Sequence, residues 1–102
     1  MMRGGNMAGM MKQMQKLQKE MTQAQDELNA TEFTATSASG MVTVVFAGDK
    51  TLKDIQIKPE AIDPDDPDML QDLVLEAVNA GLKQVDDATK AKMGKYTRGL
   101  PG

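Results

Sequence analysis

Apolar residues recur every seven positions along the first third of the chain. The members of this repeat are Met7, Met14, Met21 and Leu28, with Met10, Leu17 and Ala24 each three residues after one of the first three. This is the spacing of a coiled-coil seam, and the long polar residues between the seam positions favour helix. We therefore predict a helix over residues 7–28 that begins near residues 6–9.

So narrow an apolar stripe cannot bury itself, and the helix needs a partner from the same chain or from a second copy. Methionine also occurs on surfaces that accept several partners, but a methionine stripe with helical spacing is more often core. We interpret the seam as core. The sequence does not decide whether the helix that packs against the seam belongs to the same chain or to a second subunit.

Three short β-prone runs follow, over residues 32–38, 41–46 and 51–58. The second run is apolar on both faces and is predicted to be the central strand. In the third run Ile55 and Ile57 are expected to face inward, whereas Leu52 is out of phase and indicates a bulge or a later start. A sheet of three antiparallel strands has exposed edges and one apolar face, and a second subunit would cover both.

A second helix is predicted over residues 67–93, with Asp66 as its N-cap, Pro67 as its first residue and Gly94 at its C-cap. Its apolar stripe is broad enough to face a sheet, and Gly81 permits close approach to a strand. The stripe thins beyond Val85, so we expect that end to project. Residues 1–8 and 96–102 are expected to be flexible.

The order of these elements predicts one domain over residues 1–102 of the α/β class, α+β type. An N-terminal helix precedes a three-stranded antiparallel sheet and a C-terminal helix. The residues expected in the core or in a subunit interface are Met14, Leu17, Met21, Val42, Val44, Phe46, Ile55, Ile57, Leu73 and Ala77.

The composition argues against an enzyme. The chain has no Cys and no His, which removes thiol and imidazole nucleophiles, disulfides and most zinc or transition-metal sites. The Asp-rich stretch over residues 63–68 does not match a calcium loop, because Pro67 interrupts the ligands and Val74 occupies the twelfth position. We expect no catalytic residue, cofactor, metal or small-molecule substrate. Lacking an apolar run that could cross a bilayer, the chain is expected in the cytosol, away from membranes.

Charge is unevenly distributed. The net charge of −3 alone argues against a polyanionic partner. Every charged residue over 60–76 is acidic, however, whereas Glu20 is the only acid before residue 26 and residues 88–102 contain none. The basic residues of the two ends are Arg3, Lys12, Lys16, Lys19, Lys90, Lys92, Lys95 and Arg98. Solvation of the first helix and capping of the second are the commoner roles for such charges.

Several short motifs in a fixed order resemble the YbaB/EbfC family of bacterial nucleoid-associated proteins. They are Met10-Met11-Lys12-Gln13, Gly40-Met41-Val42-Thr43-Val44, Gly48, Ile55-Gln56-Ile57 with Pro59, Met69-Leu70-Gln71-Asp72-Leu73 with Ala77 and Asn79, and Met93 with Thr97-Arg98-Gly99-Leu100-Pro101-Gly102. The resemblance implies a tweezer-like homodimer with projecting helical arms. It also implies binding of duplex DNA with little sequence preference and a role in nucleoid organisation and gene regulation.

The resemblance gives the basic ends a function. If they lie on the arms, their eight cationic side chains would contact phosphates and the acidic segment would face away. Lysines act as point charges, so specificity should be weak. The alternative is a protein-binding adaptor whose Met-rich helix grips a partner, and steep salt dependence would distinguish DNA binding from it.

Overall fold

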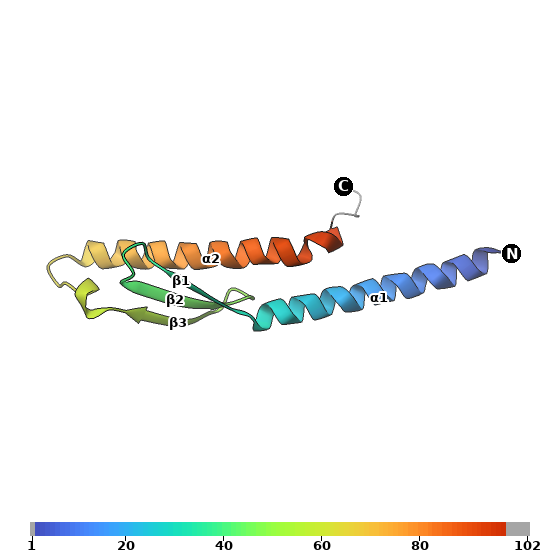
Figure 1. Ribbon diagram of the computed structural model, residues 1–102, viewed down its shortest axis with the longest axis horizontal. Coiled ribbons are helices and arrows are strands. Elements are labelled where there is room, and N and C mark those ends of the chain that lie inside the picture. Colours follow the sequence, from blue (N-terminus) through green and yellow to red (C-terminus); the bar gives the residue numbers. More distant parts are fainter. Residues whose placement is uncertain (1, 98–102) are drawn as a thin grey trace.

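Two long helices and a small sheet make up the computed structural model, which describes the backbone of residues 2–97 and the side chains of residues 7–96. The elements are α1 (Met2–Ala30), β1 (Glu32–Thr36), β2 (Val42–Ala47), β3 (Leu52–Ile57), the 3-10 turn η1 (Pro59–Ala61) and α2 (Pro67–Thr97). Figure 1 shows α2 running along the sheet and α1 leaving the end of the sheet beside the last turns of α2. The molecule is elongated, with extents of 80 × 25 × 14 Å. The predicted order of helix, three strands and helix is confirmed.

The strands form an antiparallel sheet in the order β1-β2-β3, so β2 is central as predicted. Val45 pairs with Asp54 and Phe46 pairs with Leu52, which leaves Lys53 as an extra residue in β3. This is the bulge that the phase of Leu52 indicated. It places Leu52 and Ile55 on the same face although they are three residues apart.

The core lies between α2 and the face of the sheet formed by β1 and β2. Val42, Val44 and Val85 are fully buried there, and Phe46 is 3% exposed. A Cβ atom at residue 81 would come within 2.5 Å of the Phe46 ring. Gly81 therefore allows α2 to approach the central strand closely, as the sequence predicted.

The third strand is less covered than the sequence predicted. Ile57 is half-buried and packs against the core, but Ile55 is 40% exposed and Leu52 is 45% exposed. Both side chains lie on the same face of the sheet as Val44 and Phe46. The prediction that Ile55 faces inward is therefore correct in direction, although Ile55 is not buried. They remain accessible because α2 lies over β1 and β2.

Within one chain the α1 seam is buried only in its C-terminal half, so the expectation that its N-terminal half is core or subunit interface stays a prediction. Near the sheet, Ala24 and Leu28 are buried and Met21 is half-buried. The remaining seam residues are exposed by 64% at Met7, 62% at Met10, 60% at Met14 and 41% at Leu17. The cause is the position of α2, whose last turns lie beside residues 20–27 of α1. Beyond that point α1 continues as an arm with no partner among the described residues (Figure 1).

The helix ends also differ from the sequence-based expectations. Helix α1 begins at Met2 rather than near residues 6–9, and α2 continues through Gly94 to Thr97. Tyr96, expected in a loose tail, is buried in this last part of α2, which extends past the end of the sheet as expected and packs beside α1 (Figure 1). Residues 98–102 lie outside the described part of the chain. The start of α2 is as predicted, since Asp66 Oδ1 accepts a hydrogen bond from the Met69 N–H at 3.2 Å.

Within the described residues, neither helix combines the length and apolar character needed to cross a bilayer. The same residues contain no group of three or more acidic side chains arranged to hold a metal ion.

The turn between β2 and β3 joins both helices to the sheet. The Gly48 N–H donates to the Thr31 carbonyl at 3.0 Å, directly after the end of α1. Lys50 Nζ in the same turn lies 3.1 Å from Asp86 Oδ1 of α2. A Cβ atom at residue 48 would overlap the carbonyl oxygen of Leu28. Glycine is therefore required where the arm joins the body.

Replacing Gly48 with Ala should lower the free energy of unfolding by about 2 kcal/mol or more, because a backbone oxygen cannot rotate away from the added methyl group. Urea unfolding followed by circular dichroism measures this loss. Gly9→Ala is the control, since a Cβ atom there meets nothing within 4 Å and alanine favours helix. Equal stability of Gly48→Ala and the wild type would contradict the close junction.

Candidate nucleic-acid interface

Three lysines lie on one side of α1, at and beyond the point where α2 ends. Lys12, Lys16 and Lys19 are exposed and make no ion pair within the described part of the chain. Their spacing of four and three residues confines them to an arc of about 60° on the helix surface. The arm therefore presents a lysine face, which we define as Lys12, Lys16 and Lys19.

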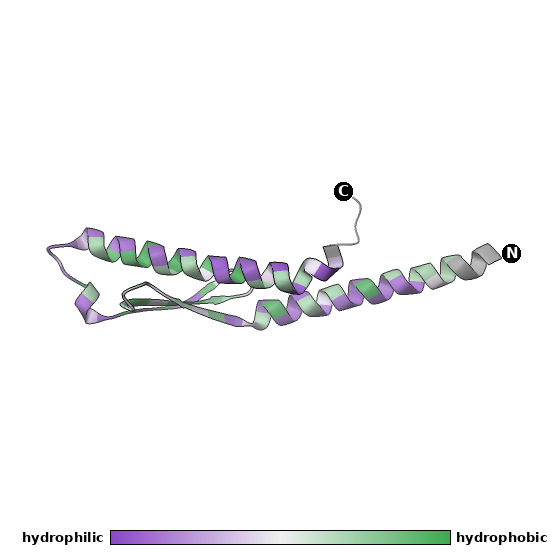
Figure 2. Ribbon diagram, turned by 45° about the horizontal axis from the view of Figure 1, so that its top comes forward, coloured by the Kyte–Doolittle hydropathy of each residue, from purple (hydrophilic) through white to green (hydrophobic). Residues whose placement is uncertain are grey.

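The lysine face is opposite the exposed part of the seam. At 100° per residue, Met7 and Met14 lie about 120° or more from each of the three lysines. Figure 2 shows the alternation of hydrophobic and hydrophilic residues continuing along α1 past the end of α2. One side of the arm is thus cationic and the other apolar.

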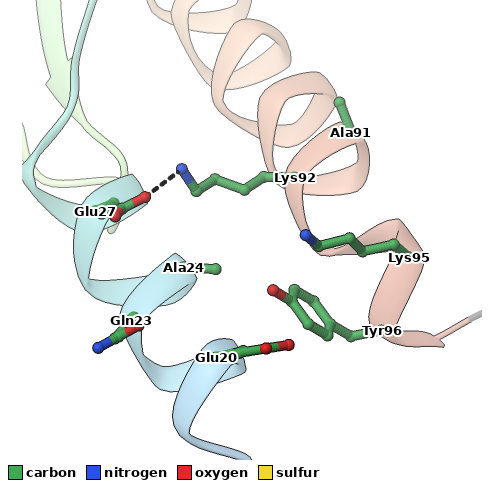
Figure 3. A pocket seen from close by; sticks show the side chains of 8 residues that line it. All are labelled: Glu20, Gln23, Ala24, Glu27, Ala91, Lys92, Lys95 and Tyr96. Atoms are coloured by element: carbon green, nitrogen blue, oxygen red, sulfur yellow. Dashed lines mark hydrogen bonds and ion pairs between the residues drawn. The ribbon is translucent and has the colours of Figure 1, made fainter. Parts of the chain in front are cut away.

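A cleft of about 510 Å³ separates α1 from the last turns of α2 (Figure 3). Lys92 Nζ from α2 lies 2.8 Å from Glu27 Oε2 of α1. The hydrogen bond from Lys92, with its positive charge, holds the pKa of the Glu27 carboxyl below its usual value. Lys95 Nζ stands 4.9 Å from the centroid of the Tyr96 ring, within the range of a cation–π contact. Two of the predicted cations are therefore already engaged within the chain.

The predicted cations of α2 do not share one face. Lys92 and Lys95 line the cleft toward α1, whereas Lys90 is exposed beside Thr89 and Met93. Lys90 and Lys92 are about 160° apart around the helix. Of the other predicted cations, Arg3 belongs to α1 but its side chain is not described, and Arg98 lies outside the described residues.

The residues of α1 that line the cleft and the residues of the lysine face lie on neighbouring parts of the helix surface. Lys12 and Lys16 fall within about 80° of Glu20 and Glu27, which line the cleft toward α2. The basic side of the arm therefore extends the line of the cleft beyond the end of α2. From Lys12 to Lys19 it spans about 10 Å of helix axis, which is about three base pairs of duplex DNA.

This arrangement suits an extended polyanion better than a small ligand. The cleft is open and lined by both carboxylates and ammonium groups, and the lysine face is convex. Ammonium groups along a helix attract phosphates without reading base edges. The lysine face is therefore the candidate surface for a phosphate backbone.

Sequence reasoning missed Glu27 and Tyr96. Glu27 is 65 residues from Lys92 in sequence, so the pair becomes visible only once α1 and α2 lie antiparallel. Tyr96 carried a usable signal, because it follows Val85 by eleven residues, or about three helical turns. Continuing the apolar stripe by that period would have placed Tyr96 on the packed side of α2.

Comparison with known proteins gives consistent matches across the chain. The model of the YbaB/EbfC DNA-binding family matches residues 2–100. A nucleoid-associated protein of Lacticaseibacillus casei is 72% identical over 97 residues, covering 95% of this chain and 98% of the relative. A nucleoid-associated protein of Ligilactobacillus salivarius is 61% identical over 102 residues, covering 100% of this chain and 98% of the relative.

The fold has a counterpart among solved structures. The crystal structure of an uncharacterized protein from Helicobacter pylori aligns with a TM-score of 0.73 at 28% identity. The alignment covers 85% of this chain and 91% of that chain. With a family match that spans almost every residue, and with relatives of such high identity, the chain belongs to the YbaB/EbfC DNA-binding family.

Proposed function

We propose that this protein acts in the cytoplasm, on the nucleoid, as a homodimer that binds duplex DNA with little sequence preference. In this role it contributes to nucleoid organisation and gene regulation. The observation that carries the proposal is the lysine face of the arm, three exposed ammonium groups without an ion pair within the described residues. The description of the family as DNA-binding and the names of the relatives support it.

Binding takes place through counterion release. Each lysine that approaches a phosphate displaces condensed cations from the duplex, which favours association and makes it salt-dependent. Lys12, Lys16 and Lys19 need break no internal contact to do this. Lys92 must first leave Glu27, so it contributes less than an unpaired lysine. Lys90, Lys95, Arg3 and Arg98 complete the proposed set.

A second copy of the chain covers the apolar residues that one copy leaves exposed. We name two such surfaces: the arm seam, which is Met7, Met10, Met14 and Leu17, and the β3 margin, which is Leu52 and Ile55. Exposed apolar side chains with helical spacing are typical of a surface that associates. Because the lysine face is opposite the arm seam and away from the β3 margin, a homodimer leaves the lysines free and doubles their number.

The alternative is an adaptor that binds another protein through the arm seam, with the lysine face serving only solubility. The exposure of Met7, Met10 and Met14 favours this second candidate, since methionine surfaces adapt to different partner helices. Affinity for such a partner should be nearly insensitive to salt.

Replacing Lys12, Lys16 and Lys19 together with Gln should weaken duplex binding by about tenfold or more, equally for unrelated sequences, and reduce the salt slope by about three per subunit. Glutamine keeps the length and helix preference of the side chains while removing the charge. Electrophoretic mobility shift at several salt concentrations measures both quantities.

The control for net charge changes Lys53, Lys58 and Lys83 to Gln, which removes the same charge from exposed positions away from the arm; Lys53 and Lys83 are paired with Glu32 and Asp87. Its affinity should stay within about threefold of the wild type. Equal losses in both triple variants would mean that net charge, not the lysine face, governs binding. Wild-type affinity in the first variant would remove this face from the interface.

Glu27→Gln should strengthen duplex binding about two- to fivefold, because Lys92 loses its carboxylate partner and becomes available to a phosphate. Glu60→Gln makes the same charge change at an exposed site on η1 and is the control. Fluorescence anisotropy with one labelled duplex compares the two. An equal increase in both variants would show that the Glu27–Lys92 pair does not restrain Lys92.

A further inference from the structure

The described lysines differ in the charges that surround them. Four are each paired with a carboxylate, with distances from Nζ to oxygen of 2.8 or 3.1 Å: Lys50, Lys53, Lys83 and Lys92. Lys95 lies over the Tyr96 ring. Lys90 is exposed one helical turn after Asp86 and Asp87, and Lys58 is exposed with no other lysine within four residues. Of the described lysines, those of the lysine face alone have ammonium groups as their nearest charged neighbours on the helix.

Each residue of the lysine face has another one turn away. Lys16 follows Lys12 by four residues and precedes Lys19 by three, so that neighbouring Cβ atoms lie about 5–6 Å apart. Glu20 lies one turn after Lys16, but the two side chains make no ion pair. A small dianion that reaches one of these lysines therefore meets a second ammonium group beside it.

An acyl phosphate is a dianion that transfers its acyl group to an amine. After the ammonium group has lost one proton to water, the nitrogen lone pair attacks the carbonyl carbon. The C–N bond forms, the bond from that carbon to the phosphate oxygen breaks, and a second proton of the nitrogen passes to the phosphate that leaves. The product is a neutral amide, so each acylated lysine loses one positive charge. A neighbouring ammonium group favours this reaction because it attracts the phosphate of the reagent.

We propose that the lysine face is a site of acylation by acyl phosphates, and that this modification controls DNA binding. The control rests on the proposed function, whereas the modification site does not. An acylated lysine no longer displaces counterions from a duplex, so affinity falls with each residue modified. DNA and the acyl phosphate compete for the same ammonium groups: the free protein reacts, and a bound duplex shields the lysine face.

The first test measures where an acyl phosphate reacts. The full-length protein is treated with acetyl phosphate at low ionic strength, and acetylation of each lysine is followed by peptide mass spectrometry. Acetic anhydride, which is uncharged, gives the reactivity due to accessibility alone. Relative to the anhydride, acetyl phosphate should favour the lysine face over Lys58 and Lys90 by about threefold or more. Equal ratios at all these positions would overturn the modification site.

The variant Lys16→Gln tests whether neighbouring ammonium groups direct the reaction. Lys16 is one turn from both Lys12 and Lys19, so its loss should lower their rates with acetyl phosphate about two- to threefold and leave their rates with the anhydride unchanged. Lys58→Gln removes the same charge from an exposed site elsewhere and is the control. Equal rates at Lys12 and Lys19 in the two variants would overturn the role of the cluster.

The second test measures the control of DNA binding. After acetylation of the lysine face has been confirmed, fluorescence anisotropy with one labelled duplex should show a dissociation constant raised by about tenfold or more. Circular dichroism of the same samples checks that helix content is kept. The control variant carries Lys12→Gln, Lys16→Gln and Lys19→Gln. Its dissociation constant at low salt should rise less than about threefold on the same treatment, because the three reactive amines are absent.

The outcomes separate the two proposals. Untreated protein that binds the duplex and keeps its affinity after confirmed acetylation of the lysine face overturns the control alone. Equal weakening of the wild type and the triple variant also overturns the control, because acetylation elsewhere would then be responsible. Untreated protein that does not bind the duplex overturns the proposed function and, with it, the control, whereas the modification site is decided by the rate ratios of the first test.

Discussion

The close approach of α2 to the central strand, which Gly81 allows beside Phe46, places α2 over β1 and β2 and leaves β3 less covered. With no side chain at residue 81, α2 sits directly over β2, and the ring of Phe46 fills the space beside it. From there α2 reaches only as far as residues 20–27 of α1. The first turns of α1 are left without cover, and β3 keeps an apolar margin. The β3 margin is exposed because α2 covers β1 and β2, and the arm is exposed because α2 ends beside residues 20–27.

The arm carries two kinds of surface on opposite sides of one helix. Exposed lysines lie on one side, and exposed methionines with heptad spacing lie on the other. Acidic and basic residues also lie toward opposite ends of the molecule. Figure 1 places the segment before α2, where the acidic run begins, at the far end from the amino terminus. An acidic protein can in this way direct a polyanion to its arm, because local potential rather than net charge steers association.

The sequence predicted features that depend on neighbouring residues better than features that depend on how distant elements pack. The apolar run over residues 41–46 predicted that β2 is the central strand, and the capping of α2 by Asp66 needed only its own neighbours. The exposure of Ile55 and Met14 could not be predicted, because burial depends on where α2 ends and which strands it covers. A heptad repeat is the same whether its partner lies in the same chain or in a second copy. The Glu27–Lys92 pair likewise needs the antiparallel placement of two helices far apart in sequence.

The central claim is that an acidic chain binds duplex DNA through a local cationic surface without reading its sequence. The most direct measurement is fluorescence anisotropy of the wild-type protein with two labelled duplexes of unrelated sequence, titrated from low to near-physiological salt. Non-specific binding by the lysine face should give similar affinities for both duplexes and a logarithmic salt slope of about −3 or steeper. Binding to neither duplex at low salt, or affinity for one duplex alone that salt leaves unchanged, would contradict it.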